Sequence, residues 1–347
     1  MEIEAQIAAR EPAPRAWKYG EQRLYEASPL GLFGTTAALF VILIGLYVAA
    51  AGADNRPWFV MSKAGPGLDR RAWVAICLSL IVSAALGLQR YSQLSDMKDG
   101  PVFARDLPPG FSWFPTFSKT RLRLWTVVGA AAGGGAMLWF LSTGGSGDVG
   151  PAVGTWSVAI AAVLGVLFFR GVELTRTGTR HSRDVLRAGI VVDLLRIERL
   201  YPFGRAAART ATIWFTVSAA TLLLLVGTAL GPAMAAFGAV CAAIGGWVFF
   251  GTLGQIRQAI RAAKAVELEQ LRHQMVELKA RLHADPAAPA KLQSLLAYEA
   301  RIDAVREWPF DQTTFARMAA SSLVLAVPWF GQAFAGALVE RFSALIR

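Results

Sequence analysis

Ionisable side chains are missing from six long stretches of this sequence. These stretches are mainly apolar, contain no Asp, Glu, Lys, Arg or His, and cover residues 33–52, 72–88, 124–142, 154–169, 211–230 and 233–252. About 20 apolar residues in a helix cross the roughly 30 Å of hydrocarbon in a bilayer. Only 17% of all residues are charged, whereas about 25% is usual for soluble domains. The sequence therefore predicts an all-α fold: a polytopic transmembrane helical bundle with six spans.

Residue types that carry common chemistries are also scarce. Cys77 and Cys241 stand apart inside apolar runs, which excludes a disulfide framework and a cysteine zinc site. Phosphate-binding glycine loops, HExxH and dinucleotide fingerprints do not occur in the sequence. Proton-coupled transport usually depends on carboxylates or histidines within the membrane, and the six spans contain none. We therefore predict no catalytic residue, no cofactor and no metal site, and regard an enzyme as the least supported class.

Basic residues are distributed unevenly between the connections. The N-terminal arm (residues 1–32), the connections 89–123 and 170–210, and the stretch 253–317 together hold 29 Lys and Arg, whereas the alternate connections hold 4. Lys and Arg concentrate on the cytoplasmic side of membrane proteins. This bias predicts a multi-pass protein of the cytoplasmic (inner) membrane with a cytoplasmic N-terminus. It also explains the net charge of +11 without a nucleic-acid partner, and the Arg-rich loops are expected to contact anionic headgroups.

Small residues mark one face of the third and sixth predicted spans. The third carries Gly129 and Gly133, and the sixth carries Gly238, Ala242 and Gly246 at four-residue spacing. Small residues let membrane helices approach closely. We expect these faces to pack within the chain, and the alternative is a face that lines a pore or a dimer.

Residues 253–307 predict a cytoplasmic antiparallel helical hairpin. Leucine and methionine recur at 3-4-3-4 spacing before a proline-containing turn at 284–289, and a second set follows the turn; this spacing is typical of a coiled-coil seam. The predicted seam residues are Leu268, Leu271, Met275, Leu278, Leu282, Leu295, Tyr298, Ile302 and Val305. Two such helices joined by a short turn pack most simply against each other, and the same surface is a candidate for assembly or for binding a partner.

The last 40 residues, 308–347, contain a broken apolar segment. Residues 318–339 are uncharged and long enough to cross a bilayer, but Pro328, Gly331 and Gln332 interrupt their middle. A break of this kind requires protein or water to satisfy the freed backbone groups. The sequence fits either a kinked seventh span or a re-entrant pair of half-helices, with a slight preference for the second.

Uncharged spans beside an elaborated cytoplasmic side favour a scaffold or signalling protein. In this interpretation, the helical hairpin mediates assembly with further copies or recruits a cytoplasmic protein partner. The alternative is an oligomeric channel or transporter for an uncharged solute, which would use the small-residue faces and the break at Pro328. No resemblance to a known family supports either interpretation.

Overall fold

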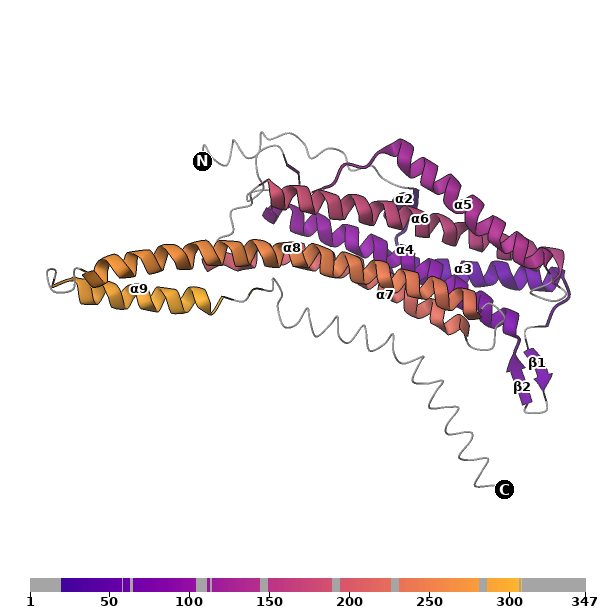
Figure 1. Ribbon diagram of the computed structural model, residues 1–347. Helices are drawn as coiled ribbons and strands as arrows, with labels where there is room; N and C mark the ends of the chain where they lie inside the picture. The colour runs from indigo at the N-terminus through magenta and orange to yellow at the C-terminus, as the bar shows by residue number, and fades with distance from the viewer. Residues whose placement is uncertain are drawn as a thin grey trace, which may run out of the picture.

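The fold consists almost entirely of helices, which Figure 1 shows in the computed structural model. The structure describes residues 20–57, 59–62, 65–103, 111–112, 114–143, 149–188, 194–225, 231–280, 286–305 and 307. The predicted segment 308–347, with Pro328, Gly331 and Gln332, lies outside these residues.

Five helices in the described part of the chain are long and apolar enough to cross a membrane. They are α3 (Gly31–Ala53), α4 (Arg70–Phe103), α5 (Lys119–Ser142), α6 (Pro151–Arg187) and α8 (Gly231–Ala280). This confirms the prediction of a helical protein with several helices that are long and apolar enough to cross a membrane. The predicted span 211–230 coincides with α7 (Tyr201–Leu222) and the short 3-10 turn η2 (Leu223–Leu225), and its last residues are not described.

The remaining elements are short. α2 (Gly20–Ala27) precedes α3, the 3-10 helix η1 (Leu194–Leu200) leads into α7, and α9 (Ala288–Asp303) follows α8. The connection between α3 and α4 contains an antiparallel β-hairpin, β1 (Phe59–Ser62) and β2 (Gly65–Leu68), in which Phe59 pairs with Leu68. The sequence predicted helices only, because these strands are four residues long and too short for a periodic pattern.

The long helices run alongside one another, and the chain reverses direction at two ends of the bundle (Figure 1). α5 packs on α6, α7 packs on α8, and α4 contacts α3, α6 and α7. The end that holds the β-hairpin is tied by polar contacts between distant segments. The carboxylate of Asp54 accepts hydrogen bonds from the backbone N–H groups of Ala152 and Val153, at 3.2 and 2.8 Å, and so caps the N-terminus of α6 from the end of α3.

Glycines set the close approach of α5 and α6. A Cβ atom added to Gly129 would lie 2.5 Å from the carbonyl oxygen of Gly165, and one added to Gly133 would overlap that of Ala161. Packing holds membrane helices together because lipid tails are as apolar as the side chains they would replace. Gly129 and Gly133 therefore serve a contact within this chain.

We predict that Gly133→Ala separates α5 from α6 and lowers the free energy of unfolding by about 1–3 kcal/mol, as overpacking does. Gly135→Ala is the matched control, since a Cβ there meets no atom within 4 Å and the change gains about 1 kcal/mol of helix propensity. Thermal unfolding in detergent measures both variants. Equal stability of the two proteins would contradict this account of the contact.

Candidate functional site

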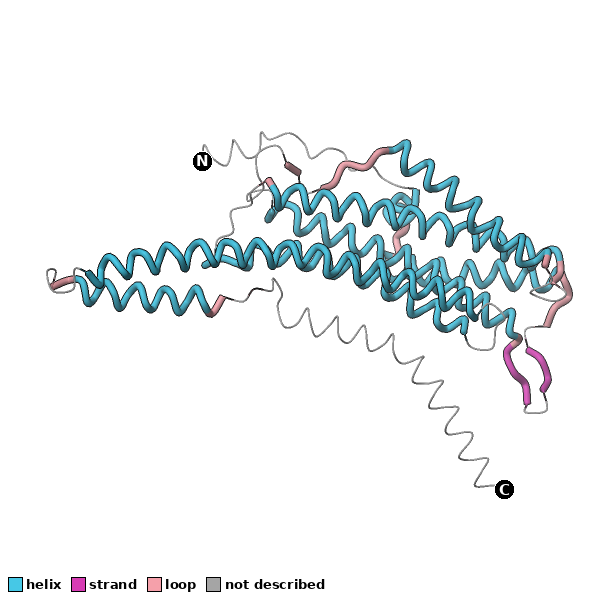
Figure 2. The backbone as a smooth tube through the Cα atoms, viewed as in Figure 1, coloured by secondary structure: helices cyan, strands magenta, loops and turns pink. Residues whose placement is uncertain are grey.

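The longest helix of the described chain extends well beyond the bundle. α8 has 50 residues, which corresponds to about 75 Å at 1.5 Å per residue, and a bilayer core needs about 30 Å. Figures 1 and 2 show its C-terminal half projecting from the bundle, with α9 lying back along it. We call this part, residues 257–280 together with α9, the α8–α9 extension.

The structure brings most of the predicted seam residues into one hydrophobic cluster. Leu271 and Ile302 are buried, and the partly buried members packed against the cluster include Leu268, Met275, Leu295, Tyr298 and Val305. The cluster continues into the bundle through Val185 of α6 and Phe203 of α7. Leu282 lies outside the described residues. The seam thus faces the interior of the chain and joins the extension to the bundle.

Charged side chains hold α9 in place along α8. Two pairs connect the two helices, Lys264–Asp303 and Arg272–Glu299, with N–O distances of 3.2 and 3.3 Å. Glu307, four residues after the end of α9, pairs with Arg257 and Arg261 of α8 at 3.3 and 2.6 Å. The hydroxyl of Tyr298 also donates a hydrogen bond of 3.2 Å to Glu267. Partners that lie later on α8 lie earlier in the following segment, which is the register of antiparallel helices. Basic groups come from α8 in all four pairs, and acidic groups from α9 or from Glu307.

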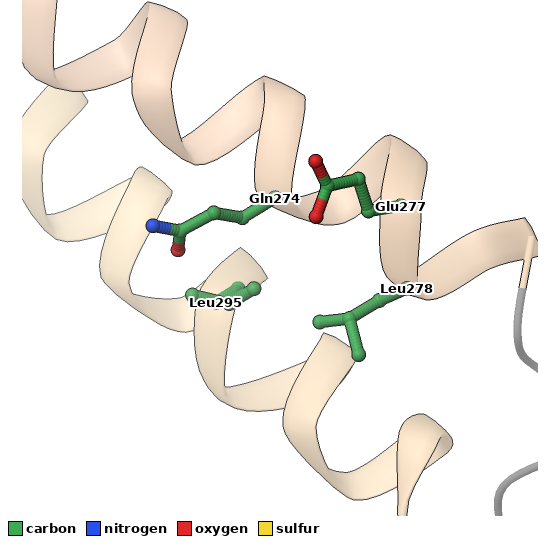
Figure 3. Close-up of a pocket in the computed structure, with 4 residues that line it drawn as sticks. All are labelled: Gln274, Glu277, Leu278 and Leu295. Atoms are coloured by element: carbon green, nitrogen blue, oxygen red, sulfur yellow. The ribbon is translucent and has the colours of Figure 1, made fainter.

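A shallow hollow lies near the tip of the extension. Gln274, Glu277 and Leu278 of α8 line it together with Leu295 of α9 (Figure 3). Its volume is about 210 Å³, whereas binding sites for drug-sized molecules measure about 300–1,000 Å³. Leu278 therefore lies at the edge of the seam beside a surface depression, and this hollow does not form a pocket for such a molecule.

A charged cluster, which the sequence analysis missed, joins α4 to α7. The guanidinium of Arg209 donates hydrogen bonds to Asp96 at 2.5 Å and to Asp99 at 2.9 Å, and Arg205 donates one to Asp99 at 3.0 Å. The side chain of Arg209 is only 13% exposed. These residues lie more than 100 positions apart in the sequence, so no local spacing indicated their contact.

The sixth predicted span contacts α7 through only part of the small-residue set that the sequence indicated. The hydroxyl of Ser218 donates a 2.7 Å hydrogen bond to the carbonyl of Gly238, so Gly238 does contact α7. A Cβ on Gly246, however, would meet no atom within 4 Å, whereas one on Gly245 would lie 3.1 Å from Phe215. The buried small residues are Gly238, Cys241 and Gly245, which follow 3-4 spacing, and Ala242 is only partly buried.

Among the described residues, no three His, Cys, Asp or Glu side chains are placed to hold a metal ion. Comparisons with protein-family models, curated proteins and solved structures give no match. The α8–α9 extension and the charged cluster are two parts of the described structure in which charged side chains from different helices meet. The ion pairs in both position helices against each other.

We predict that Arg209→Gln destabilises the bundle by about 2–3 kcal/mol, because it leaves Asp96 and Asp99 without their main counter-charge. Arg205→Gln is the control: its side chain is 45% exposed, and an exposed pair contributes about 1 kcal/mol or less. Unfolding of both variants in the same detergent gives the comparison. Losses of the same size would show that burial of Arg209 has no energetic role.

Acid should loosen the contact between α8 and the end of α9. Hydrogen bonds from Arg261, and then from Arg257, lower the pKa of Glu307 below its ordinary value of 4.5. A lowered pKa means that the contact is fully present above pH 4.5 and is lost as the pH falls below that value through the lowered pKa. Spin labels at Gln258→Cys and Ala304→Cys should report a broader distance distribution under those conditions.

Glu307→Gln should show the broad distribution at neutral pH and respond less to acid. Glu269→Gln serves as the control, because Glu269 pairs with His273 on its own helix. A narrow distribution in the Glu307→Gln protein at neutral pH would contradict the role assigned to this carboxylate.

Proposed function

We propose that this chain is a scaffold or signalling protein of the cytoplasmic membrane whose α8–α9 extension recruits a cytoplasmic protein partner. The observation that carries the proposal is the continuity of α8, which is one helix from Gly231 to Ala280. It includes a candidate membrane span and also forms one half of the extension. A partner bound to the extension would therefore be held at a fixed position relative to the membrane.

The charge distribution supports six spans with a cytoplasmic N-terminus. Three features belong to the connections rich in Lys and Arg: the charged cluster at the ends of α4 and α7, the start of α5, and the α8–α9 extension. Their basic residues favour a cytoplasmic location for that end of the bundle. We assign α7 as the fifth of the six spans in chain order, in addition to the five helices named above, because it packs between α4 and α8 and its residues 211–222 are uncharged.

The outer face of the extension is the surface for recruitment. Leu271 and Ile302 are buried in the chain's own core, so assembly of several copies through the seam would first require α9 to leave α8. Val266 and Val276 are 59% and 67% exposed and lie on the outer side of α8 with the exposed His273. This mixed face, held by the pairs with α9, favours a protein partner over self-assembly through the seam.

Cysteine labelling tests the orientation. We expect a membrane-impermeant maleimide to label Thr143→Cys in intact cells, and to label Val276→Cys only after the membrane is opened. Both positions are exposed, and the native cysteines are buried. Labelling of Val276→Cys in intact cells would place the extension outside and refute the proposal.

A photo-crosslinking amino acid at Val266, which is 59% exposed and is kept when residues 268–298 are removed, tests recruitment in cells. We expect one discrete protein adduct, which disappears when residues 268–298 are replaced by a short Gly-Ser linker. A short linker can close because α8 and α9 lie side by side near the ends of the deletion, where the side chains of Lys264 and Asp303 form an ion pair. Membrane insertion should be unchanged. The control places the crosslinker at Val127 of α5, which is exposed on a span. An adduct of twice the chain's mass would indicate self-assembly instead.

A further inference from the structure

The start of α5 and the middle of α6 form a charged face around a buried carboxylate. The side chain of Glu173 is only 7% exposed, and its two oxygens lie 4.0 Å from Arg121 and 3.9 Å from Arg176. Both arginines are largely exposed, at 64% and 47%. The two distances exceed those of hydrogen bonds, which end near 3.2 Å. Glu173 thus holds both guanidinium groups on one side without saturating their N–H donors.

Two aromatic rings lie one helical turn away from these charges, toward the centre of the membrane. Trp125 of α5 and Phe169 of α6 are stacked, with ring centroids 5.7 Å apart and planes inclined by 13°. Trp125 follows Arg121 by four residues and Phe169 precedes Glu173 by four, so each ring shares a helix face with its charged neighbour. The face therefore changes from aromatic to cationic within about 6 Å.

This change coincides with the expected membrane boundary. α5 has 24 residues, about 36 Å at 1.5 Å per residue, so its first turn lies at the headgroup level if the helix crosses the bilayer. Tryptophan favours this level, and arginine extends from it toward phosphate groups. The inference below rests on the cytoplasmic-membrane location proposed above for this end of the bundle.

We propose that Arg121 and Arg176 bind the phosphodiester of one anionic phospholipid, with the Trp125–Phe169 stack against its glycerol and upper acyl chains. A guanidinium matches phosphate oxygens with two parallel N–H groups. The two arginines and Glu173 together carry one net positive charge, which favours an anionic headgroup over a zwitterionic one. Glu173 acts as a positioning residue, since it holds the two guanidinium groups about the same point.

Lipid titration of the full-length protein in detergent tests this site. Phosphatidylglycerol, phosphatidylethanolamine and phosphatidylcholine are added separately, and binding is followed by native mass spectrometry and by the shift in Tm. We expect phosphatidylglycerol to bind most tightly, and its preference over phosphatidylcholine to fall about ten- to thirtyfold in Arg121→Gln/Arg176→Gln, as expected for two interfacial cations.

The matched control is Lys119→Gln/Arg123→Gln, which also removes two positive charges, both from the turn of α5 that carries Arg121. Both residues are exposed and lie about 160° around α5 from Arg121, by the 100° rotation per residue of a helix. The control should keep the preference. The binding of two lipids is compared within one variant, so a change in the stability of that variant affects both lipids equally. If the double variant does not fold, Arg176→Gln alone is used.

If both double variants lose the preference for phosphatidylglycerol equally, the preference comes from general surface charge and the proposed site is wrong. The absence of a preference for phosphatidylglycerol in the unmodified protein would overturn it directly. If phosphatidylethanolamine binds as tightly as phosphatidylglycerol, Glu173 contacts its ammonium group, and the choice of an anionic lipid is wrong. None of these results bears on the recruitment of a partner by the α8–α9 extension, which the crosslinking experiment tests separately.

Discussion

Polar groups buried between packed helices have no water to bond, and this constraint governs how the helices of the bundle contact one another. The indole N–H of Trp214 donates to Thr175 at 3.0 Å, and that of Trp73 donates to the carbonyl of Leu223 at 3.1 Å. Each bond joins two helices or a helix and a turn. Where no polar side chain joins two helices, glycines let their backbones come into contact, as in α5 and α6. The bundle is therefore held by a few directional contacts among many non-specific ones.

The ionic contacts of the described residues follow the same pattern, because all of them lie outside the six uncharged stretches of the sequence. The charged cluster at Arg209 fixes α4 against α7, and α7 packs along α8. The pairs between α8 and α9 then fix the extension. These pairs contribute register more than free energy, since exposed salt bridges are weak. The burial of Leu271 and Ile302 supplies the apolar contact that the charges align.

Long-period features were readable from the sequence, and contacts between distant segments were not. Apolar runs such as 33–52 predicted membrane-crossing helices, because hydropathy alone decides that property. The contact of Asp54 with Ala152 spans 98 residues and leaves no local pattern. The sixth span shows a subtler failure: four-residue spacing indicated Gly246, but the helix turns by 3.6 residues and buries Gly245 instead. The sequence spacing identified the small residues, but it did not show which of them the rotation of the helix turns toward α7.

The hydrophobic cluster explains why the extension and the bundle must move together. Ile256 and Ile260 of α8 are fully buried in it, beside Ala207 of α7 and Ile302 of α9. Displacing α8 relative to α7 would open this core at the point where α9 also packs, and cavities in a core are costly. We therefore expect a change in the position of the apolar helices to reach α9 through these shared side chains, because α8 is one continuous helix. The same continuity would let an event at the extension act on the bundle, as the proposed scaffold or signalling role requires.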